Sequence, residues 1–74
     1  MAIGPTLQEA RLKKQMTPSQ VAEITRMKVQ LVEDLERDDF HRIAATIYGK
    51  GFIKLFAECV GLDPKPLIAD YVRS

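Results

Sequence analysis

The chain has 74 residues, of which 11 are Lys or Arg and 10 are Asp or Glu, so its formal net charge is +1. This length allows a single domain, and a hydrophobic fraction of 46% is typical of a globular protein and excludes a disordered chain. A nucleic-acid-binding domain of this size is usually clearly basic, because contacts with phosphate supply much of its affinity, and the overall charge does not favour that class.

The first expected elements are an N-terminal arm over residues 1–5 and a helix that follows it. Thr6 is the predicted N-cap of this helix, and Glu9, three residues later, would complete a capping box. Leu7, Ala10 and Leu12 give the helix its apolar residues. Three basic residues favour its negative C-terminal end, namely Arg11, Lys13 and Lys14.

Two short helices joined by a tight turn are predicted over residues 17–37. Thr17 is the expected N-cap of the first, with Pro18 at its first position and Gln20 completing a capping box. This helix ends at about Thr25, and the second runs from about residue 28 or 29 to residue 37. Such a pair is typical of a helix-turn-helix motif. The expected packing positions are Val21, Ala22, Thr25, Met27, Val32, Leu35 and Glu36.

Two further helices complete the chain. A fourth, longer helix is predicted over residues 46–60, closed by Gly61 just past its C-terminus. A C-terminal helix over residues 63–73 begins with Asp63 as N-cap and Pro64 at its first position. Since no window alternates with period two, we expect residues 1–74 to form one compact, all-α, five-helix domain.

One candidate function of the motif is the recognition of DNA. The start and outer face of the third helix would then enter the major groove, and the candidate contacts are Lys28, Gln30, Leu31 and Arg37. Asp34 and Glu33 also point outward on this prediction and would lie near the phosphate backbone. Residues 17–40 hold three basic and six acidic side chains, a net charge of −3, so attraction to DNA would be weak.

The fourth helix offers a different surface. Apolar side chains cover about 200° of its circumference, about twice the stripe that a helix needs to face its core. They are Tyr48, Phe52, Ile53, Leu55, Phe56, Ala57, Cys59 and Val60. Either the helix is central and packs on two neighbours, or part of the arc binds a protein partner beside Lys50 and Lys54.

The sequence resembles the N-terminal cytoplasmic domain of the RodZ family over about residues 6–72. The resemblance rests on the runs VAEITRMKVQLVEDLERDDF and IYGKGFIKLFAECVGLDP. Within the second run, residues 50–57 follow a family pattern of basic, Gly, aromatic, aliphatic, basic, variable, aromatic and Ala, with Lys where Arg is more usual. Only the first run is shared with the Cro/C1-type repressors.

The resemblance implies a partner and a site. RodZ links the actin-like filament protein MreB to the inner membrane in cell-shape maintenance, and its aromatic pair faces MreB with basic residues assisting. The matching positions here are Phe52 and Phe56, with Lys50 and Lys54. A RodZ-like protein would continue through a basic linker and a membrane span, which places this domain on the cytoplasmic side. The alternative is the DNA-binding domain of a Cro/C1-type transcription regulator.

No residue pattern favours catalysis, a cofactor or a metal. His41 is the only histidine, and the sequence has no His/Cys cluster for zinc and no phosphate-binding glycine loop. Cys59 is the only cysteine, so an intrachain disulfide is excluded and a reducing, cytoplasmic compartment is expected. The N-terminus lacks the pattern of a signal peptide, and no apolar run reaches the ~18 residues of a membrane span. We therefore expect a non-enzymatic binding domain.

Overall fold

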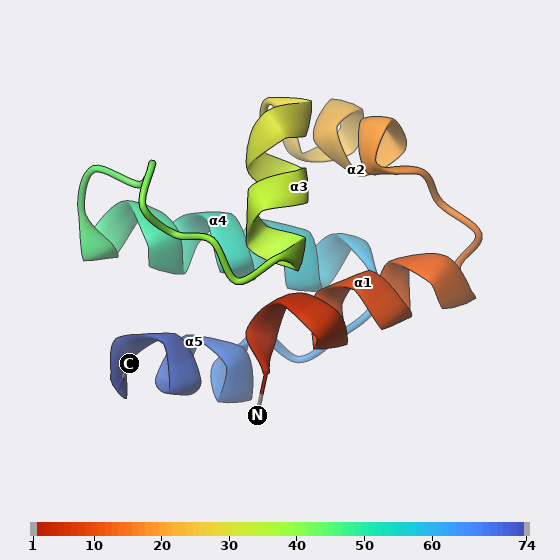
Figure 1. Ribbon diagram of the computed structural model, residues 1–74. Helices are drawn as coiled ribbons and strands as arrows, with labels where there is room; N and C mark the ends of the chain where they lie inside the picture. Colours follow the sequence, from red (N-terminus) through yellow and green to blue (C-terminus); the bar gives the residue numbers. More distant parts are fainter. Residues whose placement is uncertain (1, 74) are drawn as a thin grey trace.

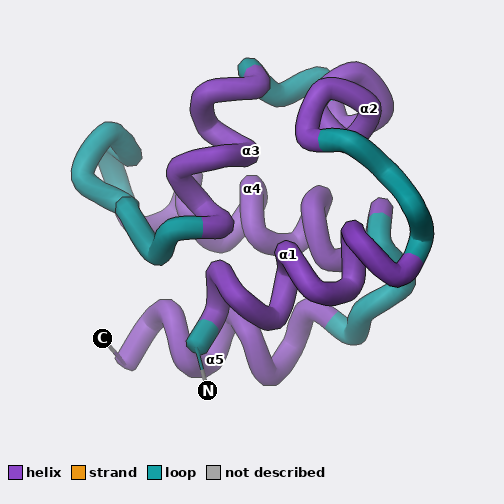
Figure 2. The backbone as a smooth tube through the Cα atoms, turned by 45° about the vertical axis from the view of Figure 1, so that its right-hand side comes forward, coloured by secondary structure: helices purple, strands orange, loops and turns teal. Residues whose placement is uncertain are grey.

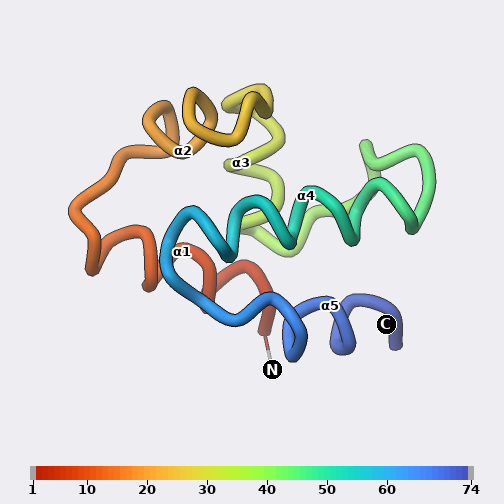
Figure 3. Tube along the Cα trace, turned by 180° about the vertical axis from the view of Figure 1, so that it is seen from behind, coloured from red at the N-terminus to blue at the C-terminus, as the bar shows by residue number. Residues whose placement is uncertain are grey.

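The computed structural model describes residues 2–73, which form a compact arrangement of helices without a strand (Figure 1). The helices are α1 (Ile3–Lys13), α2 (Pro18–Thr25), α3 (Val29–Glu36), α4 (Thr46–Cys59) and α5 (Pro64–Arg73). The predicted all-α, five-helix fold is confirmed. Views from opposite sides show α4 crossing the middle, with α2 and α3 on one side of it and α5 on the other (Figures 1 and 3).

The expected arm over residues 1–5 is wrong for the residues that the structure describes. Helix α1 begins at Ile3, its N-cap is Ala2, and no side-chain capping bond is made there. The Thr6 hydroxyl lies inside the helix and donates a hydrogen bond to the Ala2 carbonyl oxygen, 2.6 Å away, so it caps nothing. A proline in the first turn needs no hydrogen-bond partner for its nitrogen, which is why Pro5 does not prevent this early start.

Glycine at position 4 lets α1 lie directly on the C-terminal end of α3. A Cβ built on Gly4 would stand 2.3 Å from the Glu36 carbonyl oxygen. The backbone N–H of Gly4 donates to Asp38 Oδ1 at 2.7 Å, so the free N–H of the first turn finds its acceptor 34 residues away. These contacts bury Ile3 and Gly4.

Helices α2 and α3 form the predicted helix-turn-helix (Figure 2). The capping box at Thr17 is confirmed: Thr17 Oγ1 accepts from the Gln20 N–H, and Gln20 Oε1 accepts from the Thr17 N–H. The turn passes through Arg26 in the left-handed region, with φ 63°, and Met27 is buried behind it. All the packing positions predicted for this motif are buried.

The core draws on all five helices and centres on α4. Its most buried side chains are Leu7, Val21, Val32, Leu35, Ile53, Phe56 and Leu67, each 2% exposed or less. Helix α5 packs along α4, where the Tyr71 ring lies against Gly49, and a Cβ there would stand 2.0 Å from the Tyr71 hydroxyl. Phe40 meets the same ring edge to face, with centroids 5.2 Å apart. The predicted end of α4 is confirmed, because Gly61 adopts φ 80° just past it.

Candidate partner-docking surface

Helix α4 divides its apolar residues between the core and the surface. The inward side carries Gly49, Ile53, Phe56 and Ala57, and Val60 follows at the C-cap. Ile47, Tyr48 and Leu55 remain exposed by 72%, 59% and 44%, and Phe52 is partly buried between the two sides. One half of the 200° arc therefore packs on neighbouring helices, and the other half is open to solvent.

The structure corrects the aromatic pair expected to face a partner. Phe56 is 0% exposed, so its side chain is a core residue that no partner reaches without unfolding the helix packing. The accessible aromatic pair is instead Tyr48 and Phe52, one helical turn apart. Ile47, Tyr48, Gly51, Phe52 and Leu55 together are called the α4 outer face below.

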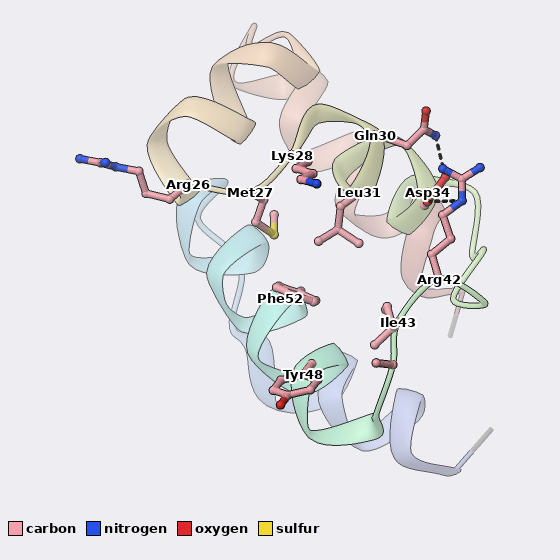
Figure 4. Close-up of a pocket in the computed structure, with 11 residues that line it drawn as sticks. Arg26, Met27, Lys28, Gln30, Leu31, Asp34, Arg42, Ile43, Tyr48 and Phe52 are labelled. Carbon is pink, nitrogen blue, oxygen red and sulfur yellow. Dashed lines mark hydrogen bonds and ion pairs between the residues drawn. The ribbon is translucent and has the colours of Figure 1, made fainter.

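A groove of about 680 Å³ runs between α3, the connector before α4 and α4 itself (Figure 4). Its apolar lining comes from Met27 and Leu31 on one side, Ile43 in the connector, and Tyr48 and Phe52 on α4. The α4 outer face and this α3–α4 groove are continuous, because the two aromatic residues belong to both. Three basic residues also line the groove: Arg26 and Lys28 from the turn of the helix-turn-helix, and Arg42 from the connector.

Asp34 is at the centre of a polar cluster beside the groove. The sequence placed it outward, which is wrong: its side chain is 2% exposed. Its Oδ1 accepts from Gln30 Nε2 at 2.9 Å and from Arg37 at 2.8 Å, and Arg42 Nε lies 3.7 Å from Oδ2. In this way one buried carboxylate holds side chains from α3 and from the connector (Figure 4).

The cluster changes the interpretation of the DNA candidates. Gln30 and Arg37 each donate one hydrogen bond to Asp34, which restricts the orientation of both side chains and leaves part of their donors for a base or a phosphate. Leu31 is partly buried against the core and lines the groove. Lys28, the N-cap of α3, is exposed. Lys28, Gln30 and Leu31 share the lining of one groove, Arg37 lies outside it, and Lys28 and Arg37 are both exposed.

The two lysines expected at the protein-binding site lie on the exposed part of α4. Lys50 and Lys54 are one turn apart, on the flank of the α4 outer face, with the exposed Glu58 one turn further along. Arg11, one of the three basic residues near the end of α1, is by contrast buried in an ion pair with Glu36. Lys13 and Lys14 remain exposed at the C-terminal end of α1, so accessible positive charge lies there as well as around α4 and the groove.

His41, in the connector between α3 and α4, contacts the nearby Asp39 and does not form a catalytic or metal site with it. Its Nδ1 is hydrogen-bonded to Asp39 Oδ1, and this bond is the main reason why the pKa of Asp39 is lowered. Both groups lie at the surface. Within the described part of the chain, no cluster of His, Cys, Asp and Glu side chains has an arrangement that could hold a metal ion.

Comparison with known proteins decides the family. Residues 6–67 match the family described as "Helix-turn-helix domain". The chain belongs to this helix-turn-helix family. The helix-turn-helix domain is also 28% identical over 69 residues to the "Cytoskeleton protein RodZ" of Streptococcus pneumoniae (strain ATCC BAA-255 / R6). That alignment covers 93% of this chain and 25% of the relative, so the chain spans about a quarter of the relative's length. No solved structure matches the chain significantly.

These matches support a RodZ-like helix-turn-helix domain. From Ala2 to Arg73, no helix is both long enough and apolar enough to cross a membrane.

The exposed apolar residues of α4 that the sequence analysis did not name among its candidate site residues are Ile47, Tyr48 and Leu55. A signal for them was present, because positions 48, 52 and 55 share one side of a helix and 49, 53, 56 and 60 share the other. What the pattern does not tell is which of the two sides faces the core.

Proposed function

We propose that this domain docks on an actin-like cytoskeletal filament protein of the MreB type, on the cytoplasmic side of the membrane, through the α4 outer face. The observation that carries the proposal is the row of exposed apolar residues on α4, with Ile47 and Tyr48 more than half exposed. A contiguous exposed apolar surface on a small domain usually marks an interaction site. The RodZ relative is by its name a cytoskeleton protein, which supports a filament protein as the partner.

The chemistry of this surface fits a protein partner. Tyr48 and Phe52 offer large aromatic areas, and interface energy tends to concentrate on such anchors. Lys50 and Lys54 lie beside them and would meet acidic side chains on the filament, which would speed association more than they would deepen affinity. Phe56 supports the surface from below, since it fixes α4 in the core.

Co-sedimentation with polymerised filament protein from the same organism tests the proposal. Phe52→Ala and Tyr48→Ala should each raise the Kd about 30-fold, the effect of losing a hot-spot contact of about 2 kcal/mol. Leu12→Ala is the matched control, because Leu12 is a large exposed apolar residue on α1, outside the α4 outer face. Unchanged binding of both aromatic variants would contradict the proposal.

Phe56→Ala gives a different readout from the two surface variants. The loss of a fully buried Phe should cost about 3–5 kcal/mol of unfolding free energy, so weaker binding by this variant would follow from unfolding. A double variant of Phe52 and Phe56 therefore mixes docking with folding, and Phe52→Ala alone is the cleaner test.

The second candidate function is sequence-specific DNA binding, which the helix-turn-helix family match favours. The engagement of Gln30 and Arg37 by Asp34 and the acidic charge of residues 17–40 both weigh against it. A DNase footprint at a defined palindrome in about 150 mM salt would favour this candidate. Weak binding that vanishes with salt and shows no footprint would favour the docking function.

A further inference from the structure

Gly51 is a glycine that the fold itself does not require. It lies in the interior of α4 and is exposed, and apart from its two chain neighbours and the local helix backbone no described atom, side chains of α4 included, lies within 4 Å of a Cβ built on it. Gly49, two residues earlier, differs sharply, because a Cβ there would collide with the Tyr71 ring. Since glycine in a helix interior is less stable than alanine, the packing of this chain alone would favour Ala at position 51.

The missing side chain of Gly51 leaves open space on the surface of α4, a gap in the row of exposed side chains that is called the hole below. On a helix surface, residue 51 is surrounded by the residues three and four positions away, which are Ile47, Tyr48, Lys54 and Leu55. Three of these are the large apolar residues that remain exposed on α4. The walls of the hole are therefore apolar on three sides and basic on the fourth, and its floor is bare backbone.

We propose that Gly51 is the point of closest approach in the complex, where a helix of the actin-like partner packs against α4 and inserts an apolar side chain into this hole. The inference rests on the proposed docking function and specifies its geometry. Helices pack with their axes about 8–10 Å apart, and a glycine at the crossing point allows the short end of that range. The inserted residue contacts Ile47, Tyr48 and Leu55 and the α4 backbone.

The charges around the hole define the partner helix further. Lys54 forms one wall, and Lys50 lies one position before Gly51 on the same flank, while the single exposed acid nearby on α4 is Glu58. Across the adjoining groove Arg26 and Lys28 add the same sign of charge, while Arg42 is paired with the buried Asp34. The partner helix is therefore amphipathic, with an apolar residue at the crossing and acidic residues beside it.

Gly51→Ala separates folding from docking, because the two effects have opposite signs. The variant should raise the Tm by about 4 °C, as expected for replacing an exposed helical glycine in a domain of this size. In the same preparation the Kd for the filament protein should rise about tenfold or more, since the new methyl group occupies the hole. Gly51→Leu, which fills the hole completely, should raise the Kd about 100-fold while leaving the far-UV circular dichroism spectrum helical.

Ser19→Ala is the control variant, because Ser19 is exposed on α2 and outside the α4 outer face, and its Kd should not change. A higher Tm with unchanged or tighter binding in Gly51→Ala would overturn the inference, while a loss of binding in Phe52→Ala would keep the docking function intact. A lower Tm in Gly51→Ala would also overturn it, since the fold would then require the glycine. Unchanged binding in both Phe52→Ala and Gly51→Ala would overturn the docking function and the inference together.

Discussion

The buried ion pair between Arg11 and Glu36 gives the sharpest test of how α1 is held to the helix-turn-helix. Arg11 Nε lies 2.5 Å from Glu36 Oε2, and a second guanidinium nitrogen lies 3.0 Å from Oε1. The same guanidinium donates to the Met16 carbonyl oxygen at 2.8 Å, and Gln8 contacts Glu36 Oε1 at 3.3 Å. With the two side chains 9% and 4% exposed, the removal of one partner leaves a charge that water cannot reach.

The substitution Arg11→Met keeps most of the apolar stem and removes the charge. Breaking a buried pair in this way costs about 3–5 kcal/mol. A domain of this length has a total stability of about 4–11 kcal/mol, so the variant should lose a large part of it and unfold at a much lower urea concentration. Arg11→Met combined with Glu36→Leu should recover part of the loss, because neither partner then leaves an unpaired buried charge.

Urea unfolding followed by circular dichroism at 222 nm measures these differences. Lys13→Met is the matched control, because Lys13 pairs with Glu9 at 3.4 Å with both side chains more than 70% exposed, and it should lose less than about 0.5 kcal/mol. A loss below about 1 kcal/mol in Arg11→Met, or a double variant no more stable than the worse single one, would refute the reasoning.

Three further predictions concern the fold. Gly4→Ala should lower the free energy of unfolding by about 1–3 kcal/mol in urea titrations, because a Cβ would meet the α3 backbone. An unchanged free energy of unfolding would instead favour the N-terminal arm that the sequence predicted. Thr17→Ala should lower it by about 1 kcal/mol through loss of the capping box, and an unaltered urea midpoint would argue against that cap. Burial raises the pKa of the Cys59 thiol above its ordinary value, and Lys14 opposes this only weakly. The pH profile of alkylation by iodoacetamide should therefore be displaced to higher pH than in the urea-unfolded chain, and coinciding profiles would contradict the burial.

The parts of the fold that local chemistry determines could be predicted from the sequence. The capping box at Thr17, the proline after Asp63 and the left-handed Gly61 each place a helix end through residues within four positions of one another. The start of α1 could not be predicted in this way. The N–H of Gly4 in its first turn donates to Asp38, far along the chain, and the local pattern around Thr6 offered a misleading alternative.

The sequence predicts which helix carries the candidate site, but it does not predict which side of that helix is exposed. Residues 48–60 carry apolar side chains over more than half of the circumference of α4, so the pattern alone allows either half to face the core. The packing of α5 against Gly49 decides which half is buried, and that contact depends on Tyr71, which is 22 residues away. The inward position of Asp34 is partly of the same kind, because Arg37 pairs with it locally at i,i+3 but Arg42 reaches it only once the connector has folded over α3.

The most direct test of the docking account is an NMR titration of the ¹⁵N-labelled domain with the filament protein, held in a non-polymerising form. The account predicts that line broadening and shift changes concentrate on the amides of residues 47–55 in α4, with smaller effects at residues 42–44 of the connector. Changes centred on residues 28–37 of α3, or spread over α1 and α5 with α4 unaffected, would contradict it.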